Sequence, residues 1–164
     1  KDPNTAGDVT AIEEQVAFSL ELRDAMNLAV TMINDIEDIK VELEQLLPQL
    51  KDSQDKARAK QLFTSAQNIA AALYDLHLTG AREDAFRSPM KLYGRISALA
   101  SDIGGFGVDF KPTDQQREVY QVLNKRLQTA QEKFKTFLKV EVSALNKQLK
   151  KTELQLELGQ KIKS

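Results

Sequence analysis

The chain has 164 residues, of which 41% are hydrophobic and 29% charged, and its 23 basic and 24 acidic residues give a net charge of −1. This length fits one domain with a substantial core, and only 7 glycines and 4 prolines disfavour an all-β fold, which needs many turns. The absence of cysteine excludes disulfides, thiol catalysis and cysteine-bound metals. Basic and acidic residues are well mixed, and no apolar run approaches the roughly 20 residues that cross a bilayer. We therefore expect neither nucleic-acid binding nor membrane insertion.

The first eight residues are polar and include a proline and a glycine, so residues 1–8 are predicted to be a linker from a preceding domain. The sequence starts without an initiator methionine or a signal peptide. Such a start is typical of a fragment cut from a longer polypeptide.

A seven-residue apolar repeat predicts one long helix over about 10–48. One row consists of Leu22, Ala29, Ile36, Leu43 and Leu50, and a second of Met26, Ile33 and Leu47, interrupted by Lys40. Residues three and four apart share one side of a helix, so both rows are expected to be buried against other helices. Thr10 and Glu13 have the spacing of a capping box and are expected to start this helix.

Two shorter helices are predicted next, over about 53–79 and 89–103. Asp52 or Ser53 is expected to cap the first of them, and Gly80 to end it. The Ser88-Pro89 pair is expected to start the second, because proline at the first helical position loses no hydrogen bond. The apolar rows are Leu62, Ala66, Ile69, Leu73 and Leu76 in one helix, and Leu92, Ile96, Leu99 and Ile103 in the other.

A second long helix is predicted over about 114–152, starting at a capping box formed by Thr113 and Gln116. Its rows are Leu123, Ala130, Phe137 and Ala144, and Tyr120, Leu127 and Phe134. Residues 153–158 alternate as a strand would, but a helical continuation is favoured over a strand. The expected fold is an all-α, antiparallel up-and-down four-helix bundle, with a bundle domain at 9–158 and a tail at 159–164.

The predicted helices differ in length. At about 1.5 Å per residue the first would be roughly 57 Å long and the third roughly 24 Å. Part of the first apolar row is therefore expected to extend past the third helix. It would need the second helix, another subunit or another domain to cover it.

No catalytic, cofactor-binding or metal-binding residue is predicted. His77 is the only histidine and has no cysteine or second histidine to join it, so a structural or surface role is favoured. The di-iron bundle signature Glu-x-x-His is missing, and the acidic stretch 35–44 is interpreted as a solvated face. The lysine-rich end, 147–163, is interpreted as a solvated tail. The candidate interaction surface consists of Tyr93, Phe106, Val108 and Phe110, although a plug that closes the end of the bundle is the favoured interpretation of these residues.

Three stretches carry a resemblance to a known family: 15–24 (QVAFSLELRD), 88–100 (SPMKLYGRISALA) and 112–116 (PTDQQ). They resemble the helical C-terminal region of bacterial sortilin-like proteins, also labelled BNR-repeat or glycosyl-hydrolase-like, in which a β-propeller precedes this region. The resemblance implies export to the periplasm, the cell surface or the medium. The propeller's Asp-box repeats and any glycosidase centre are not in this chain, so the resemblance supplies no catalytic residue.

From these observations we expect a non-catalytic accessory domain that packs on the preceding β-propeller domain of the same polypeptide or mediates assembly. The first alternative is a self-standing homo-oligomerisation module, and the second is a bundle enzyme with a metal site. No cofactor is expected.

Overall fold

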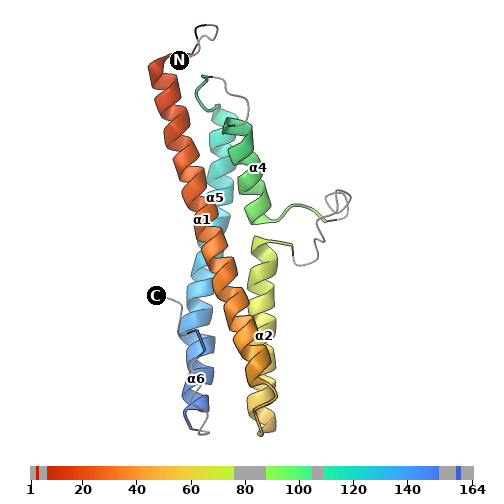
Figure 1. Ribbon diagram of the computed structural model, residues 1–164. Helices are drawn as coiled ribbons and strands as arrows, with labels where there is room; N and C mark the ends of the chain where they lie inside the picture. Colours follow the sequence, from red (N-terminus) through yellow and green to blue (C-terminus); the bar gives the residue numbers. More distant parts are fainter. Residues whose placement is uncertain (1–2, 4–6, 76–87, 105–108, 152–157, 160–164) are drawn as a thin grey trace. The chain divides into compact units, whose positions relative to one another are not determined.

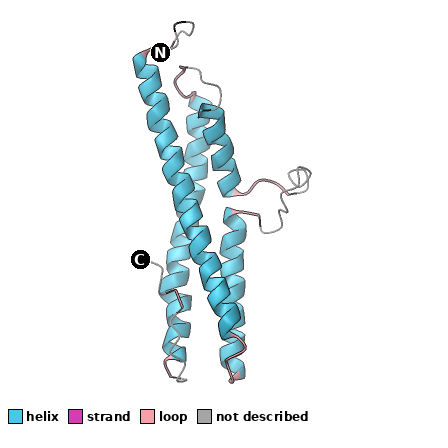
Figure 2. Ribbon diagram, viewed as in Figure 1, coloured by secondary structure: helices cyan, strands magenta, loops and turns pink. Residues whose placement is uncertain are grey.

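The computed structural model describes residues 3, 7–75, 88–104, 109–151 and 158–159. These residues form helices and loops, and no strand occurs among them (Figure 1; Figure 2). α1 spans Val9–Leu46, α2 spans Ser53–Leu73 and α4 spans Leu92–Gly104. The last helix continues without a break through α5 (Asp114–Thr136), the π-helical turn η1 (Phe137–Val142) and α6 (Ser143–Leu149). The all-helical fold class predicted from the sequence is confirmed for the described residues.

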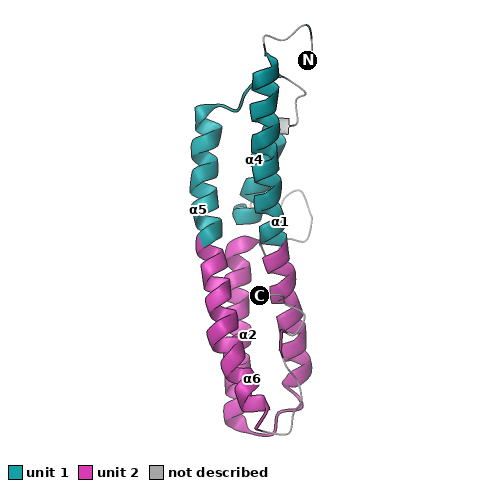
Figure 3. Cartoon of the chain, turned by 90° about the vertical axis from the view of Figure 1, so that its left-hand side faces the viewer, with its two compact units in different colours: residues 1–30, 77–128 teal, residues 31–76, 129–164 magenta. Residues whose placement is uncertain are grey.

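The chain divides into two compact units (Figure 3). Unit 1 comprises residues 1–30 and 77–128, and unit 2 comprises residues 31–76 and 129–164. Unit 1 therefore contains the first part of α1, α4 and most of α5. Unit 2 contains the second part of α1, α2, the end of α5, η1 and α6. In the part of the chain that the structure describes, three helical segments build each unit.

The buried face of α1 is a strict heptad stripe whose members alternate in steps of four and three residues. Its ten members are each at most 6% exposed: Phe18, Leu22, Ala25, Ala29, Met32, Ile36, Ile39, Leu43, Leu46 and, just beyond the helix, Leu50. The first predicted row is thus confirmed. The second is wrong, because Ile33 and its row mates Met26 and Leu47 are only half-buried. The true second row lies three residues after each member of the first, on the side without the charged Lys40.

The part of the first apolar row that was expected to extend past the third helix is covered by the chain itself, the first of the three covers considered. The stripe members of unit 1, from Phe18 to Ala29, are buried in the unit that contains α4. The members of unit 2, from Met32 to Leu50, are buried in the unit that contains α2. α4 therefore shares a unit with the first part of α1, and α2 shares a unit with the second part. The chain itself covers the whole stripe.

Two of the four predicted helix starts are confirmed by their caps. The Asp52 carboxylate accepts the backbone N–H groups of Gln54 (2.7 Å) and Asp55 (3.1 Å). In the second capping box, Thr113 N–H donates to Gln116 Oε1 (2.9 Å) and Gln116 N–H to Thr113 Oγ1 (3.2 Å).

The cap predicted for α1 is wrong. Asp8, not Thr10, accepts the N–H of Ala11 at 2.7 Å, and Thr10 already lies in the helix. Either side chain could accept a free N–H group at the start of the helix. Only aspartate also carries a negative charge that complements the positive end of the helix dipole.

The two short helices are shorter than predicted. α2 ends at Leu73, because Tyr74 adopts an extended backbone (φ −143°, ψ 165°) from which its side chain reaches Glu37. Ala70, rather than the predicted Ile69, completes its buried row, and Leu76 and Gly80 lie outside the described residues. α4 starts at Leu92 instead of Pro89, and the side chain of Arg95 donates to the carbonyl of Met90 (2.9 Å) in the turn before it. Its predicted row, Leu92, Ile96, Leu99 and Ile103, is buried as expected.

The π-helical turn changes the buried face of the last helix. Up to Phe137 the buried residues follow the predicted heptad: Leu123, Leu127, Ala130, Phe134 and Phe137. Continued as a regular α-helix, the heptad would next turn Glu141 and Ala144 inward. η1 contains one extra residue per turn, so Val142, Leu145 and Leu149 are buried instead, and both Glu141 and Ala144 are exposed. The predicted inward position of Ala144 is therefore wrong.

Candidate interaction surface

The four residues predicted as an interaction surface are only partly described. Tyr93 is half-buried on α4, and Phe110, in the loop before α5, is 52% exposed. Phe106 and Val108 lie outside the described residues. Phe110 therefore offers an aromatic ring to solvent in unit 1, whereas a plug would be expected to bury it.

A shallow opening of about 390 Å³ lies beside Phe110, at the start of α1. Its lining residues are Gly7, Asp8, Thr10, Ala11, Glu14, Asp109, Phe110 and Lys111. Gly7 is essential to this geometry: a Cβ atom there would lie 1.5 Å from the carbonyl oxygen of Asp109, so any other residue would push the two segments apart. The opening combines one aromatic ring with three carboxylates and one ammonium group. This combination suits the side chains of another polypeptide better than a small apolar ligand.

A row of exposed apolar side chains, which the sequence analysis missed, lies on the solvent side of α1 in unit 1. We call it the outer face of α1, and its members are Val9 (63% exposed), Val16 (51%), Leu20 (44%) and Val30 (38%). Val16 and Leu20 follow Val9 by seven and eleven residues, and Val30 follows Val16 by fourteen, so all four lie on the side of the helix away from the heptad stripe. The same sevenfold spacing in the sequence could have revealed this face.

Side chains of α1 and α5 hold unit 1 together around Phe18. The Phe18 ring meets Tyr120 edge to face (centroids 5.3 Å apart), and the Arg117 guanidinium lies 5.3 Å from the Phe18 centroid. Arg117 also pairs with Glu14 at 3.0 Å. Both partners of this ion pair are about 40% exposed, so the aromatic contacts contribute more to stability than the pair.

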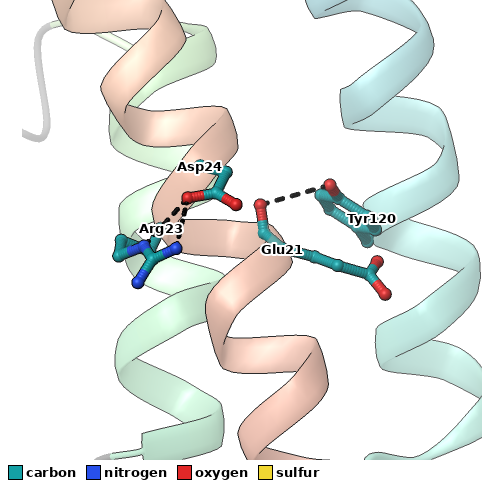
Figure 4. Close-up of polar contacts among 4 residues, drawn as sticks. All are labelled: Glu21, Arg23, Asp24 and Tyr120. Carbon is teal, nitrogen blue, oxygen red and sulfur yellow. Dashed lines mark hydrogen bonds and ion pairs between the residues drawn. The ribbon is translucent and has the colours of Figure 1, made fainter.

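Figure 4 shows the polar contacts next to this aromatic pair. The Tyr120 hydroxyl donates a long hydrogen bond (3.4 Å) to the backbone carbonyl of Glu21, and Arg23 pairs with its neighbour Asp24 at 2.7 Å. Burial, followed by the negative charges of Glu21 and Asp24, raises the pKa of Tyr120. Its proton is therefore retained at neutral pH, and the contact is structural.

In unit 2 a polar cluster explains Lys40, the interruption in the predicted row. The Lys40 side chain is only 13% exposed, pairs with Glu37 at 2.8 Å and lies 5.9 Å from the Phe63 ring centroid. Tyr74 donates its hydroxyl proton to the same carboxylate. Burial opposes the charge of Glu37, but the hydrogen bonds from Lys40 and Tyr74 outweigh it and lower its pKa. The acidic stretch 35–44 is therefore not simply a solvated face.

A pH titration is expected to reveal this cluster. Burial, then the hydrogen bond to Glu37 and its charge, raise the pKa of Tyr74 from 10.0 to about 12. A raised pKa means that this tyrosine contributes stability below pH 10, which is lost as the pH rises towards 12. Tyrosinate absorbance should show an ionisation step near pH 12 that Tyr74→Phe abolishes and the control Tyr93→Phe retains. If the step survives in Tyr74→Phe, the hydrogen bond to Glu37 is not formed.

Neither a metal-binding cluster nor a membrane-spanning helix occurs among residues 3, 7–75, 88–104, 109–151 and 158–159. No three His, Asp or Glu residues among them are grouped closely enough to hold a metal ion. None of their helices is long and apolar enough to cross a membrane. His77, the only histidine, lies outside the described residues.

The chain was also compared with known proteins. It matches no family model, no curated protein and no solved structure.

Proposed function

We propose that this chain is a non-catalytic helical interaction domain that packs, through the outer face of α1, on an apolar surface of the polypeptide to which it belongs. The observation that carries the proposal is the exposure of Val9, Val16, Leu20 and Val30 along one side of α1. Large apolar side chains that recur on the solvent side of an amphipathic helix favour a protein partner. Phe110, exposed in the same unit, supports the same conclusion.

The proposed parent is an exported bacterial protein of the sortilin-like, BNR-repeat type, with a β-propeller before this domain and a location in the periplasm, at the cell surface or outside the cell. The support is the resemblance of 15–24, 88–100 and 112–116, all of which fall in unit 1. Several of these residues make contacts there. The Gln15 side chain donates to the carbonyl of Ile103 (2.9 Å), and that of Gln116 donates to Asp102 (2.7 Å).

The proposed architecture is an antiparallel bundle. In unit 1, the last turn of α4 contacts the first turns of α1 and α5, through the two glutamine contacts just given. In unit 2, Glu37 of α1 meets the end of α2, and Gln148 of α6 meets Asp55 at its start (2.8 Å). These contacts support a central segment antiparallel to both neighbours in each unit. They favour this pattern over a strictly alternating order of four helices, which would make the first and third helices parallel.

Sedimentation of the purified chain tests whether the outer face serves the parent or the chain itself. We expect a monomer over a wide range of concentration. A dimer that Val16→Glu with Leu20→Glu dissociates, and that the control Gln128→Glu at an exposed position of α5 leaves intact, would overturn the proposal in favour of the homo-oligomerisation module. Both sites of the double variant are exposed, so folding should be retained in circular dichroism.

The coding sequence upstream of Lys1 tests the proposed parent. Propeller repeats with Asp boxes are expected there. A start codon directly before Lys1 would contradict the proposal.

A further inference from the structure

A short segment after the last helix is held by side chains of unit 2. The Asn146 carboxamide of α6 makes two hydrogen bonds to one residue: its Nδ2 donates to the carbonyl of Leu158 (3.0 Å), and its Oδ1 accepts the Leu158 N–H (2.9 Å). One amide side chain thus satisfies both backbone groups of Leu158, as a neighbouring β-strand would. Recognition of this kind is directed at a peptide backbone.

The next residue is held by a different helix. The N–H of Gly159 donates to the Glu42 carboxylate of α1 at 2.7 Å, the short length typical of a hydrogen bond to a charged acceptor. Gly159 has φ 73°, in the left-handed region that glycine adopts without strain. A proline here would remove the donor and could not reach this backbone angle.

The Leu158 side chain provides an apolar anchor. It is only 5% exposed although it lies outside all helices. The contact between α6 and Asp55 of α2 is made by a different residue, Gln148. Asn146 bonds to the segment instead. Together, the structure contains a buried leucine side chain, a carboxamide for the backbone of that residue and a carboxylate for the N–H of the next one.

We infer that Asn146 and Glu42 form a peptide-binding site in unit 2 that accepts a Leu-Gly turn with a left-handed glycine and is occupied by residues 158–159 of the chain itself. The described polar contacts to this segment come from side chains of the two helices, and they meet its backbone N–H and C=O groups. Such contacts do not depend on covalent continuity. The same segment of a second copy, or of a free peptide, therefore fits the site once the chain's own segment is displaced.

Displacement in the 164-residue chain provides the test. Gly159→Pro should empty the site, and a fluorescent synthetic peptide of residues 152–164 (TELQLELGQKIKS) should then bind, as measured by fluorescence anisotropy. The wild-type chain should bind the peptide at least about tenfold more weakly, because its own segment competes at a high effective concentration. Leu158→Ser is a second displacing variant, for use if Gly159→Pro does not fold.

Matched controls identify the site. Adding Asn146→Ala to Gly159→Pro should weaken peptide binding about tenfold or more, whereas adding Lys147→Ala, an exposed neighbour on α6, should not. A peptide that itself carries Gly159→Pro should fail to bind. If the folded displacing variants bind no peptide, or if Asn146→Ala leaves binding unchanged, the proposed site is refuted.

Discussion

Ile39→Ala is expected to lower the free energy of unfolding by about 2–5 kcal/mol, and Ile33→Ala by less than half as much. Both residues are isoleucines of α1 in unit 2, so the substitutions remove the same atoms from the same helix. Ile39 is fully buried in the heptad stripe, whereas Ile33 is half-buried beside it. Only at Ile39 does the substitution leave an enclosed cavity. The free-energy cost of that cavity adds to the lost hydrophobic transfer free energy.

Urea unfolding followed by circular dichroism measures both values. The dependence of the unfolding free energy on urea should stay unchanged, so that midpoints report stability directly. A loss at Ile33 equal to or greater than the loss at Ile39 would restore the row of Met26, Ile33 and Leu47 as the buried one. It would show that the helix is rotated relative to the structure described above.

Val142→Glu is expected to destabilise the protein by about 3 kcal/mol or more, while Val140→Glu should change the unfolding free energy by less than about 0.5 kcal/mol. Val142 is 4% exposed and Val140 is 60% exposed, although only one residue separates them. A glutamate at position 142 would remove the buried valine side chain and place a carboxylate in the core. At position 140 it would stay in water.

This pair of substitutions tests the π-helical turn directly. In a regular α-helix the residue three after Phe137 lies near the buried side and the residue five after it faces solvent. The expected costs would then be reversed, with Val140→Glu the more damaging. If Val142→Glu does not fold, Val142→Thr provides the measurement, because it replaces one buried methyl group by a hydroxyl in nearly the same shape and should still cost about 1–3 kcal/mol.

Local signals in the sequence predicted much of the fold. Asp52 and the Thr113–Gln116 box mark helix starts because a cap involves only residues a few positions apart. The row from Leu22 to Leu50 was predictable because heptad spacing places its members on one side of a helix whatever covers them. The α1 cap was misassigned to Thr10 because two acceptable capping residues lie within one turn, and only the backbone path selects between them.

The candidate sites depended more strongly on tertiary structure. Tyr93 and Phe110 were recognisable as aromatic residues in or near a glycine-rich loop, but the loop's exposure was not. Lys40 looked like a defect in an apolar row, yet it pairs with Glu37, whose carboxylate also accepts the hydroxyl of Tyr74 from the end of α2. The contacts of Leu158 and Gly159 could not be foreseen, because Asn146 and Glu42 carry no pattern that distinguishes them from other surface amides and carboxylates.

The sequence alone determined that this protein is helical, where most helices begin, and that one face of its first helix is buried, because these properties follow from interactions within a few turns. The tertiary structure decided which of two flanking rows completes that face, that α2 and α4 belong to different units, and that a π turn buries Val142 instead of Glu141. Each of these choices depends on the side chains that approach from other helices. Packing, unlike helix formation, is a property of residues that are distant in the chain.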